Sequence, residues 1–127
     1  MAFPSHCKLL IEGFVFVLLI DDPDQLGFQL CVPGVFSFKV KDARIVEPLL
    51  RHIRLIAFAE SLGGVESLMT YPAIQTHADI PAEIRDAVGV DDRLLRFSVG
   101  IEHEEDLIAD LGQALAAAVE EVQGGER

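Results

Sequence analysis

Arg96 stands in the middle of an apolar, alternating run, residues 94–101, of the kind that forms a β-strand. A guanidinium in such a strand must reach solvent or find an anion, because an unpaired buried charge is costly. Its planar fork of N–H groups matches a carboxylate through two parallel hydrogen bonds. The sequence therefore indicates a carboxylate-binding residue. Two alternatives stay open: Arg96 faces solvent, or it pairs with an acid of the chain such as Glu66 or Glu102.

A second candidate site is the segment Ser61-Leu62-Gly63-Gly64, which follows the apolar run 55–59. A strand that ends in a glycine pair allows close approach of the backbone to a ligand and frees amide donors. Ser61, Gly63 and Gly64 are therefore candidate binding residues. The alternative is a simple turn that ends the strand.

Other reactive side chains give no pattern that indicates catalysis. The chain contains no phosphate-binding loop, zinc-protease motif or nucleophile elbow. Lys39 and Lys41 flank a predicted strand and lack the surroundings of a Schiff-base lysine, so no catalytic residue is predicted. Cys7 and Cys31 are far apart and are interpreted as reduced thiols, with a single disulfide as the alternative.

The histidines are scattered along the chain, and no pair has the spacing of metal ligands, so no metal site is predicted. They are His6, His52, His77 and His103. We interpret them as structural residues, with His103 at the entrance of a helix.

Composition restricts the class of protein. Lys and Arg number 10 against 21 Asp and Glu, a formal net charge of -11 over 127 residues, which disfavours nucleic acid and anionic membrane surfaces as partners. Residues 13–20 are apolar but too few to span a bilayer, which needs about 20. They are followed by a turn signal at 21–24 and predict a buried strand. These features favour a cytoplasmic protein of one domain.

Alternation and β-branched or aromatic content predict strands at 35–40, 55–59 and 94–101, with a further extended segment at 65–71. Asp42 can cap a helix in which Pro48 either makes a kink or begins the regular part. Pro81 and Gly89 bracket a short helix at 82–88. The pattern predicts an α+β fold: a mostly antiparallel sheet with helices packed on one side.

The last helix has an acidic first turn at 104–106, which suits the helix dipole. Its apolar residues recur at helical spacing and form one stripe. They are Leu107, Ile108, Leu111, Leu115, Ala118 and Val122.

Several segments, in this order and spacing, resemble the C-terminal part of the pyridoxal-phosphate (PLP) dependent trans-sulfuration enzymes. They are AESLGGVES (59–67), Thr76-His77 with Ile80-Pro81, LRFSVGIE (95–102) and DLIADL (106–111). The likeness runs from residue 34 to 115. The sequence of residues 70–81 is most similar to that of the cystathionine γ-synthase branch. Some members of this branch also act as O-acetylhomoserine thiol-lyases.

The resemblance implies a role for each candidate residue. Arg96 would hold the α-carboxylate of an amino-acid substrate, Ser61 would assist in the same pocket, and Gly63 and Gly64 would shape its loop. It also implies the fold of the small C-terminal domain of a fold-type I PLP enzyme. We expect a poorly matching segment at 1–33, this domain at 34–122 and a frayed tail at 123–127.

The family's PLP-bearing lysine and other cofactor-binding residues have no match in the chain. The cofactor supplies the electron sink and the protein positions it. We therefore expect no stable PLP binding and no activity from the chain alone, with a PLP-binding domain or a full-length homologue as partner. Two alternatives are a non-catalytic module that docks on a homologue, and a truncated gene product without a selected function.

Overall fold

A six-stranded mixed sheet organises the molecule, in the order β1-β2-β3-β6-β5-β4. The computed structural model describes residues 9–12, 15–20 and 34–125. The strands are β1 (Leu9–Glu12), β2 (Val15–Ile20), β3 (Val35–Val40), β4 (Ala57–Phe58), β5 (Leu68–Thr70) and β6 (Leu94–Ser98). The helices are a 3₁₀ turn (Ala43–Ile45), α1 (Val46–His52), α2 (Ala82–Ala87) and α3 (Glu104–Gly124).

The sheet is mostly antiparallel, as predicted. The pairs β1–β2, β3–β6 and β5–β6 are antiparallel, and β2–β3 and β4–β5 are parallel. β2 confirms the predicted strand for residues 15–20. The turn signal at 21–24, both cysteines and His6 lie outside the described residues.

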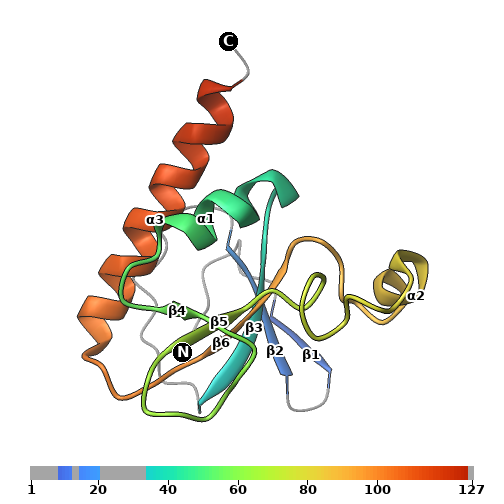
Figure 1. Ribbon diagram of the computed structural model, residues 1–127, viewed down its shortest axis with the longest axis horizontal. Helices are drawn as coiled ribbons and strands as arrows, with labels where there is room; N and C mark the ends of the chain where they lie inside the picture. The colour runs from blue at the N-terminus through green and yellow to red at the C-terminus, as the bar shows by residue number, and fades with distance from the viewer. Residues whose placement is uncertain (1–8, 13–14, 21–33, 126–127) are drawn as a thin grey trace.

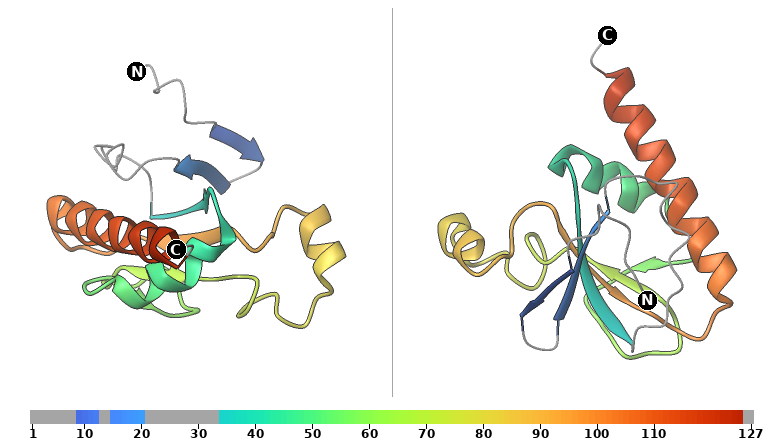
Figure 2. Two further views of the ribbon diagram at one scale, coloured as in Figure 1. Left: turned by 90° about the horizontal axis from the view of Figure 1, so that it is seen from above. Right: turned by 180° about the vertical axis from the view of Figure 1, so that it is seen from behind.

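The core lies between one face of the sheet and the helices α1 and α3 (Figure 1). Phe38, Leu95, Phe97 and Met69 are almost fully buried on this face, each at 1% exposure or less. They pack in one cluster with residues of both helices, which confirms the predicted α+β fold with helices on one side. Helix α2 is the exception: it has no buried residue and projects away from the rest of the molecule (Figure 2).

Helix α1 begins in an unexpected way. The carboxylate of Asp42 accepts a hydrogen bond from the Arg44 backbone N–H at 2.9 Å, but it caps the 3₁₀ turn. The α-helix starts at Val46, so Pro48 is its third residue. Backbone N–H groups of the first turn have no partner inside the helix, which is why proline is tolerated there. The alternative in which the regular helix begins at Pro48 is wrong by two residues, because α1 begins at Val46.

Two strands are shorter than predicted. Each one stops where its backbone contacts residues that are distant in the sequence. The amides of Arg54, Leu55 and Ile56 donate to the buried carboxylate of Asp110 on α3, at 2.8–3.1 Å, so β4 is limited to residues 57–58. β6 ends at Ser98 rather than at 101, since the following turn packs against residues 65–66.

The last helix was predicted well. His103 caps it through Nδ1, which accepts from the Glu105 amide at 3.4 Å. The helix continues to Gly124, two residues beyond the predicted domain boundary at 122. Its buried side chains are Leu107, Asp110, Leu111, Ala114, Leu115 and Ala118. Ile108 and Val122 of the predicted stripe are only half-buried.

Candidate substrate-carboxylate site

Arg96 lies on the sheet face opposite the helices. Its neighbours in β6, Leu95 and Phe97, point into the core, so the alternation of the strand turns Arg96 to the other side. The sheet register places Arg96 directly between Ser37 of β3 and Thr70 of β5. The predicted division of the strand into two faces is therefore correct for residues 94–98.

The guanidinium is held by two neutral acceptors. Nη2 of Arg96 donates to the backbone carbonyl of Glu60 at 2.7 Å and to Oγ1 of Thr70 at 3.1 Å. Its Nε is buried and has no hydrogen-bond partner within the described part of the chain. The charge thus has polar neighbours but no counter-ion among these residues. A half-buried guanidinium that has no counter-ion is suited to bind an anion.

The two acids suggested as partners do not pair with Arg96. Glu102 accepts hydrogen bonds from Ser67 instead, and Glu66 lies on the exposed loop 60–66. Arg96 is half-buried, and its Nη2 is bonded to Glu60 and Thr70, so the side chain is held in place rather than freely solvated.

Thr70 connects the two elements that surround Arg96. It is 1% exposed, accepts from Arg96 and donates its hydroxyl to the carbonyl of Ala59 at 2.6 Å. Ala59 immediately precedes Glu60, whose carbonyl is the other acceptor for Arg96. One buried hydroxyl therefore fixes both the arginine and the start of the loop that contacts it.

Ser61, Gly63 and Gly64 lie on this loop, close in sequence to the Arg96 contact. Ser61 is exposed and directly follows Glu60. Gly63 has φ 74°, a backbone conformation that favours glycine, and its N–H donates to Oγ of Ser98 at 2.9 Å. That donor is therefore occupied rather than free for a ligand. At Gly64 an added Cβ would approach nothing closer than 3.9 Å among the described atoms, so packing there does not require glycine.

The residues that hold the loop in place carry little signal in the sequence. Thr70, Ser67 and Ser98 are small polar residues in apolar surroundings, and their buried positions were not foreseen. Partial burial acts to raise the pKa of Glu102, but hydrogen bonds from the backbone and hydroxyl of Ser67 outweigh it and keep that pKa below its usual value.

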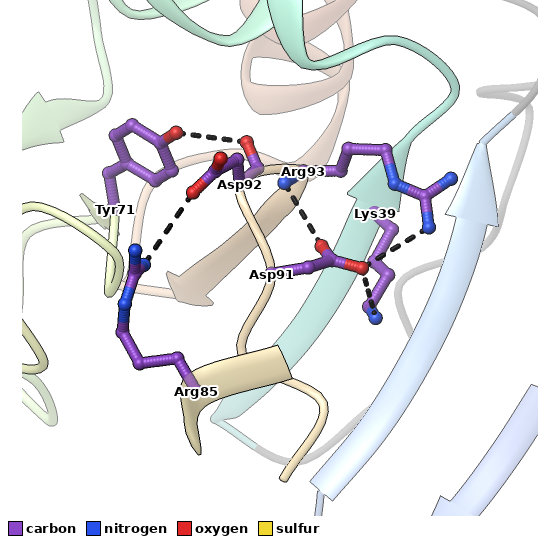
Figure 3. A network of polar contacts seen from close by, with 6 residues as sticks. All are labelled: Lys39, Tyr71, Arg85, Asp91, Asp92 and Arg93. Atoms are coloured by element: carbon purple, nitrogen blue, oxygen red, sulfur yellow. Dashed lines mark hydrogen bonds and ion pairs between the residues drawn. The ribbon is translucent and has the colours of Figure 1, made fainter. Parts of the chain in front are cut away.

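A polar network holds the segment that carries α2 (Figure 3). Nζ of Lys39 lies 2.8 Å from Oδ2 of Asp91, which also contacts Arg93 at 3.2 Å. Burial raises the pKa of Asp91, and the hydrogen bonds from Lys39 and Arg93 more than offset this and lower it. At the other side, the hydroxyl of Tyr71 donates to the backbone carbonyl of Asp92 at 2.9 Å.

This network occupies one of the two lysines in residues 34–125. Lys39 is paired with Asp91, and Lys41 is exposed at the end of β3. Neither is arranged as a Schiff-base lysine, so the described residues do not fit a PLP site. No group of three potential metal ligands occurs among them, and none of the helices in this part of the chain has the length and apolarity to cross a membrane.

Comparison with known proteins identifies the family. Residues 27–116 match the sequence profile described as Cys/Met metabolism PLP-dependent enzyme. This chain belongs to that family. The match covers most of the chain, including all of β3 to β6 and the residues around Arg96.

Curated relatives in this PLP-dependent family match at high identity. The chain is 61% identical over 87 residues to the cystathionine gamma-synthase/O-acetylhomoserine (thiol)-lyase of Bacillus subtilis. The matched region is 68% of this chain and 23% of that protein. It is 52% identical over 112 residues to the cystathionine gamma-lyase of Rattus norvegicus, or 85% of this chain and 28% of that protein. The chain thus spans about a quarter of the length of these relatives.

Solved structures of the family have the same fold over the matched part. A yeast cystathionine gamma-lyase superposes with a TM-score of 0.66 at 47% identity, over 69% of this chain and 23% of that one. A cystathionine gamma synthase from Xanthomonas oryzae pv. oryzae, in complex with cystathionine, gives a TM-score of 0.61 at 46% identity.

Proposed function

We propose that this chain is the C-terminal portion of a trans-sulfuration enzyme of the cystathionine γ-synthase type. In the complete enzyme it provides the wall of the active site that binds the carboxylate of an amino-acid substrate. Arg96 is the carboxylate-binding residue, and Ser61, Gly63 and Gly64 form the adjacent loop. The domain begins at residue 34 and includes α3 to its end at Gly124, two residues beyond the predicted boundary at 122, with 1–33 outside it.

One observation carries this proposal: the guanidinium of Arg96 is fixed by Glu60 and Thr70 and has no counter-ion among the described residues. Nη2 is occupied by these two acceptors, which orients the plane of the guanidinium. A substrate carboxylate would supply the missing negative charge. The family's dependence on PLP and its amino-acid substrates agree with this role.

Acetate is the simplest probe of the carboxylate site. Titration of the ¹⁵N-labelled chain should shift the Arg96 Nε–H resonance and the amides of residues 60–64, with weak affinity. Arg96→Ala should abolish the response of the loop, whereas Arg54→Ala, at an exposed position, should preserve it. An equal response in the Arg96→Ala protein would refute the assignment.

The chain alone is further proposed to lack trans-sulfuration activity, because the residues that would hold PLP belong to the part of the family it does not span. PLP added to the purified protein should give no absorbance band of an internal aldimine. A clear band that disappears on borohydride treatment together with modification of one lysine would overturn this part of the proposal.

A covering polypeptide is the second element of the proposal, either a PLP-binding domain or a full-length homologue. Exposed apolar side chains favour it: Ile74, Ile84 and Val88 are 59%, 56% and 67% exposed along the projecting segment. Isolated apolar groups occur on most surfaces, but a series on one projecting arm is typical of a contact region. Co-purification of the tagged chain with a PLP-binding homologue would support this role, and a strictly monomeric chain at high concentration in its presence would contradict it.

A further inference from the structure

The loop that contacts Arg96 is fastened at its far end by a single carboxylate. Oε1 of Glu102 accepts from the backbone N–H of Ser67 at 2.8 Å, and Oε2 accepts from the Ser67 hydroxyl at 2.7 Å. The same hydroxyl accepts from the N–H of Gly100 at 2.8 Å. Ser67 is completely buried, so each of these polar groups depends on the others for its partner.

Close backbone packing reinforces this contact. The N–H of Ile101 donates to the carbonyl of Val65 at 2.9 Å. A Cβ at Gly100 would collide with that carbonyl oxygen and stand 2.6 Å from the carbonyl carbon of Glu66. The turn after β6 therefore packs directly against residues 65–67, the returning limb of the loop. Only glycine fits at this position of the turn.

The other fixed points of the loop lie on both sides of the Arg96 contact. At the start of the loop, Ala59 is bound to β5. Its N–H donates to the Met69 carbonyl at 2.9 Å, and its carbonyl accepts from the Thr70 hydroxyl. The tip of the loop is bound to β6 through Gly63 and Ser98. The Glu60 carbonyl lies between these points, so its position depends on how the rest of the loop is held.

We propose that Glu102 and Ser67 are positioning residues for Arg96. They lock the returning limb of the loop 60–66 against the turn after β6, and this keeps the Glu60 carbonyl where it orients the guanidinium. Without Glu102, two donors of Ser67 lose their acceptor, the limb separates from the turn, and Arg96 loses one of its two acceptors. The role of Arg96 in carboxylate binding rests on the proposed function. The dependence of its orientation on Glu102 and Ser67 does not.

The test uses Glu102→Gln, which keeps the size of the side chain but cannot accept both hydrogen bonds from Ser67. Glu104→Gln is the matched control, since it removes the same charge from an exposed residue two positions away. Ser67→Ala is the second variant, in case Glu102→Gln does not fold. The readouts are amide hydrogen exchange of residues 59–67, the Arg96 Nε–H resonance and acetate affinity.

In both test variants, amide exchange at Gly63 and Ala59 should accelerate by about tenfold or more, and the Arg96 Nε–H resonance should shift or broaden. Acetate affinity should fall about tenfold, as for loss of one hydrogen bond to a charged group. Glu104→Gln should change none of these. A test variant that only lowers the unfolding midpoint, with the Arg96 resonance and acetate affinity as in the wild type, would overturn the proposal.

The acetate and resonance measurements separate the two claims. If acetate has no effect on the wild-type chain, the proposed function fails. The response of the Arg96 resonance and of the loop amides to Glu102→Gln still decides whether Glu102 positions Arg96.

Discussion

At the scale of single residues, the site depends on small polar side chains that share partners. Arg96 could be identified from sequence because a charge in an apolar strand is conspicuous. Its partners could not. The backbone carbonyl of Glu60 carries no sequence signal, and Thr70 resembles any β-branched strand residue. The type of the binding group was therefore predictable, while the groups that orient it emerge only from the pairing of β5 with β6.

Thr70→Val tests the importance of the shared hydroxyl. Valine has nearly the same shape, so the substitution leaves the Ala59 carbonyl and Arg96 each without one partner at a buried site. Loss of about 1–3 kcal/mol in the free energy of unfolding is expected, measured by urea denaturation. The exposed Thr76→Val is the control, with a change of less than about 0.5 kcal/mol. Equal effects of the two substitutions would show that the Thr70 hydroxyl is unimportant.

At the scale of elements, predictions succeeded where the signal was local and failed where it came from a distant residue. The pattern of residues 35–40 and the acidic first turn of α3 predicted β3 and the start of that helix correctly. β4 was predicted too long because the backbone N–H groups of residues 54–56 donate hydrogen bonds to Asp110, which is distant in the sequence. The end of β6 was missed for a similar reason, since Val65 and Glu66 approach Gly100 from another part of the chain.

Asp110 makes stability dependent on pH. Burial raises its pKa, but hydrogen bonds from the Ile56, Arg54 and Leu55 amides outweigh burial and lower it below its ordinary value. Because the folded-state pKa is the lower one, this stabilisation is complete above the unfolded pKa of about 3.9 and is lost as the pH falls through the folded value.

Asp110→Asn should therefore reduce the free energy of unfolding at pH 7 by about 2–3 kcal/mol, because the amide group cannot accept from all three backbone donors. The difference between variant and wild type should shrink below about pH 4, measured by urea denaturation across this range. The exposed Asp79→Asn serves as control and should change stability little at either pH. A difference that is independent of pH would contradict the role given to the charge.

Gly100→Ala tests the close packing at the end of β6. The added Cβ would meet backbone atoms that cannot move aside, so a loss of about 2 kcal/mol or more is expected. Gly64→Ala, three residues from the Ser67 contact, has open space around its Cβ and should cost less than about 1 kcal/mol. Urea denaturation of both proteins compares them directly, and similar values would argue against the packing described here.

At the scale of the whole molecule, the chain spans about a quarter of its curated relatives and still contains a sheet with two covering helices and a coherent core. The family resemblance was visible in the sequence because its segments occur in order, and the profile match over 27–116 confirms the family. The direction in which α2 projects could not be predicted, since its capping signals fix its ends and not its contacts. Its exposed apolar residues are part of the surface that we propose for contact with a partner.

A chimera with a complete relative measures the role of Arg96 in catalysis. Residues 34–115 of this chain replace the matching segment of the Bacillus subtilis relative, and trans-sulfuration kinetics are measured with and without Arg96→Ala. The chimera should be active, and Arg96→Ala should lower kcat/KM by about 100-fold or more, as expected when a buried charge loses its partner. Arg54→Ala should leave the kinetics unchanged. An active chimera whose kcat/KM is unaffected by Arg96→Ala would contradict the assignment of Arg96 as the carboxylate-binding residue.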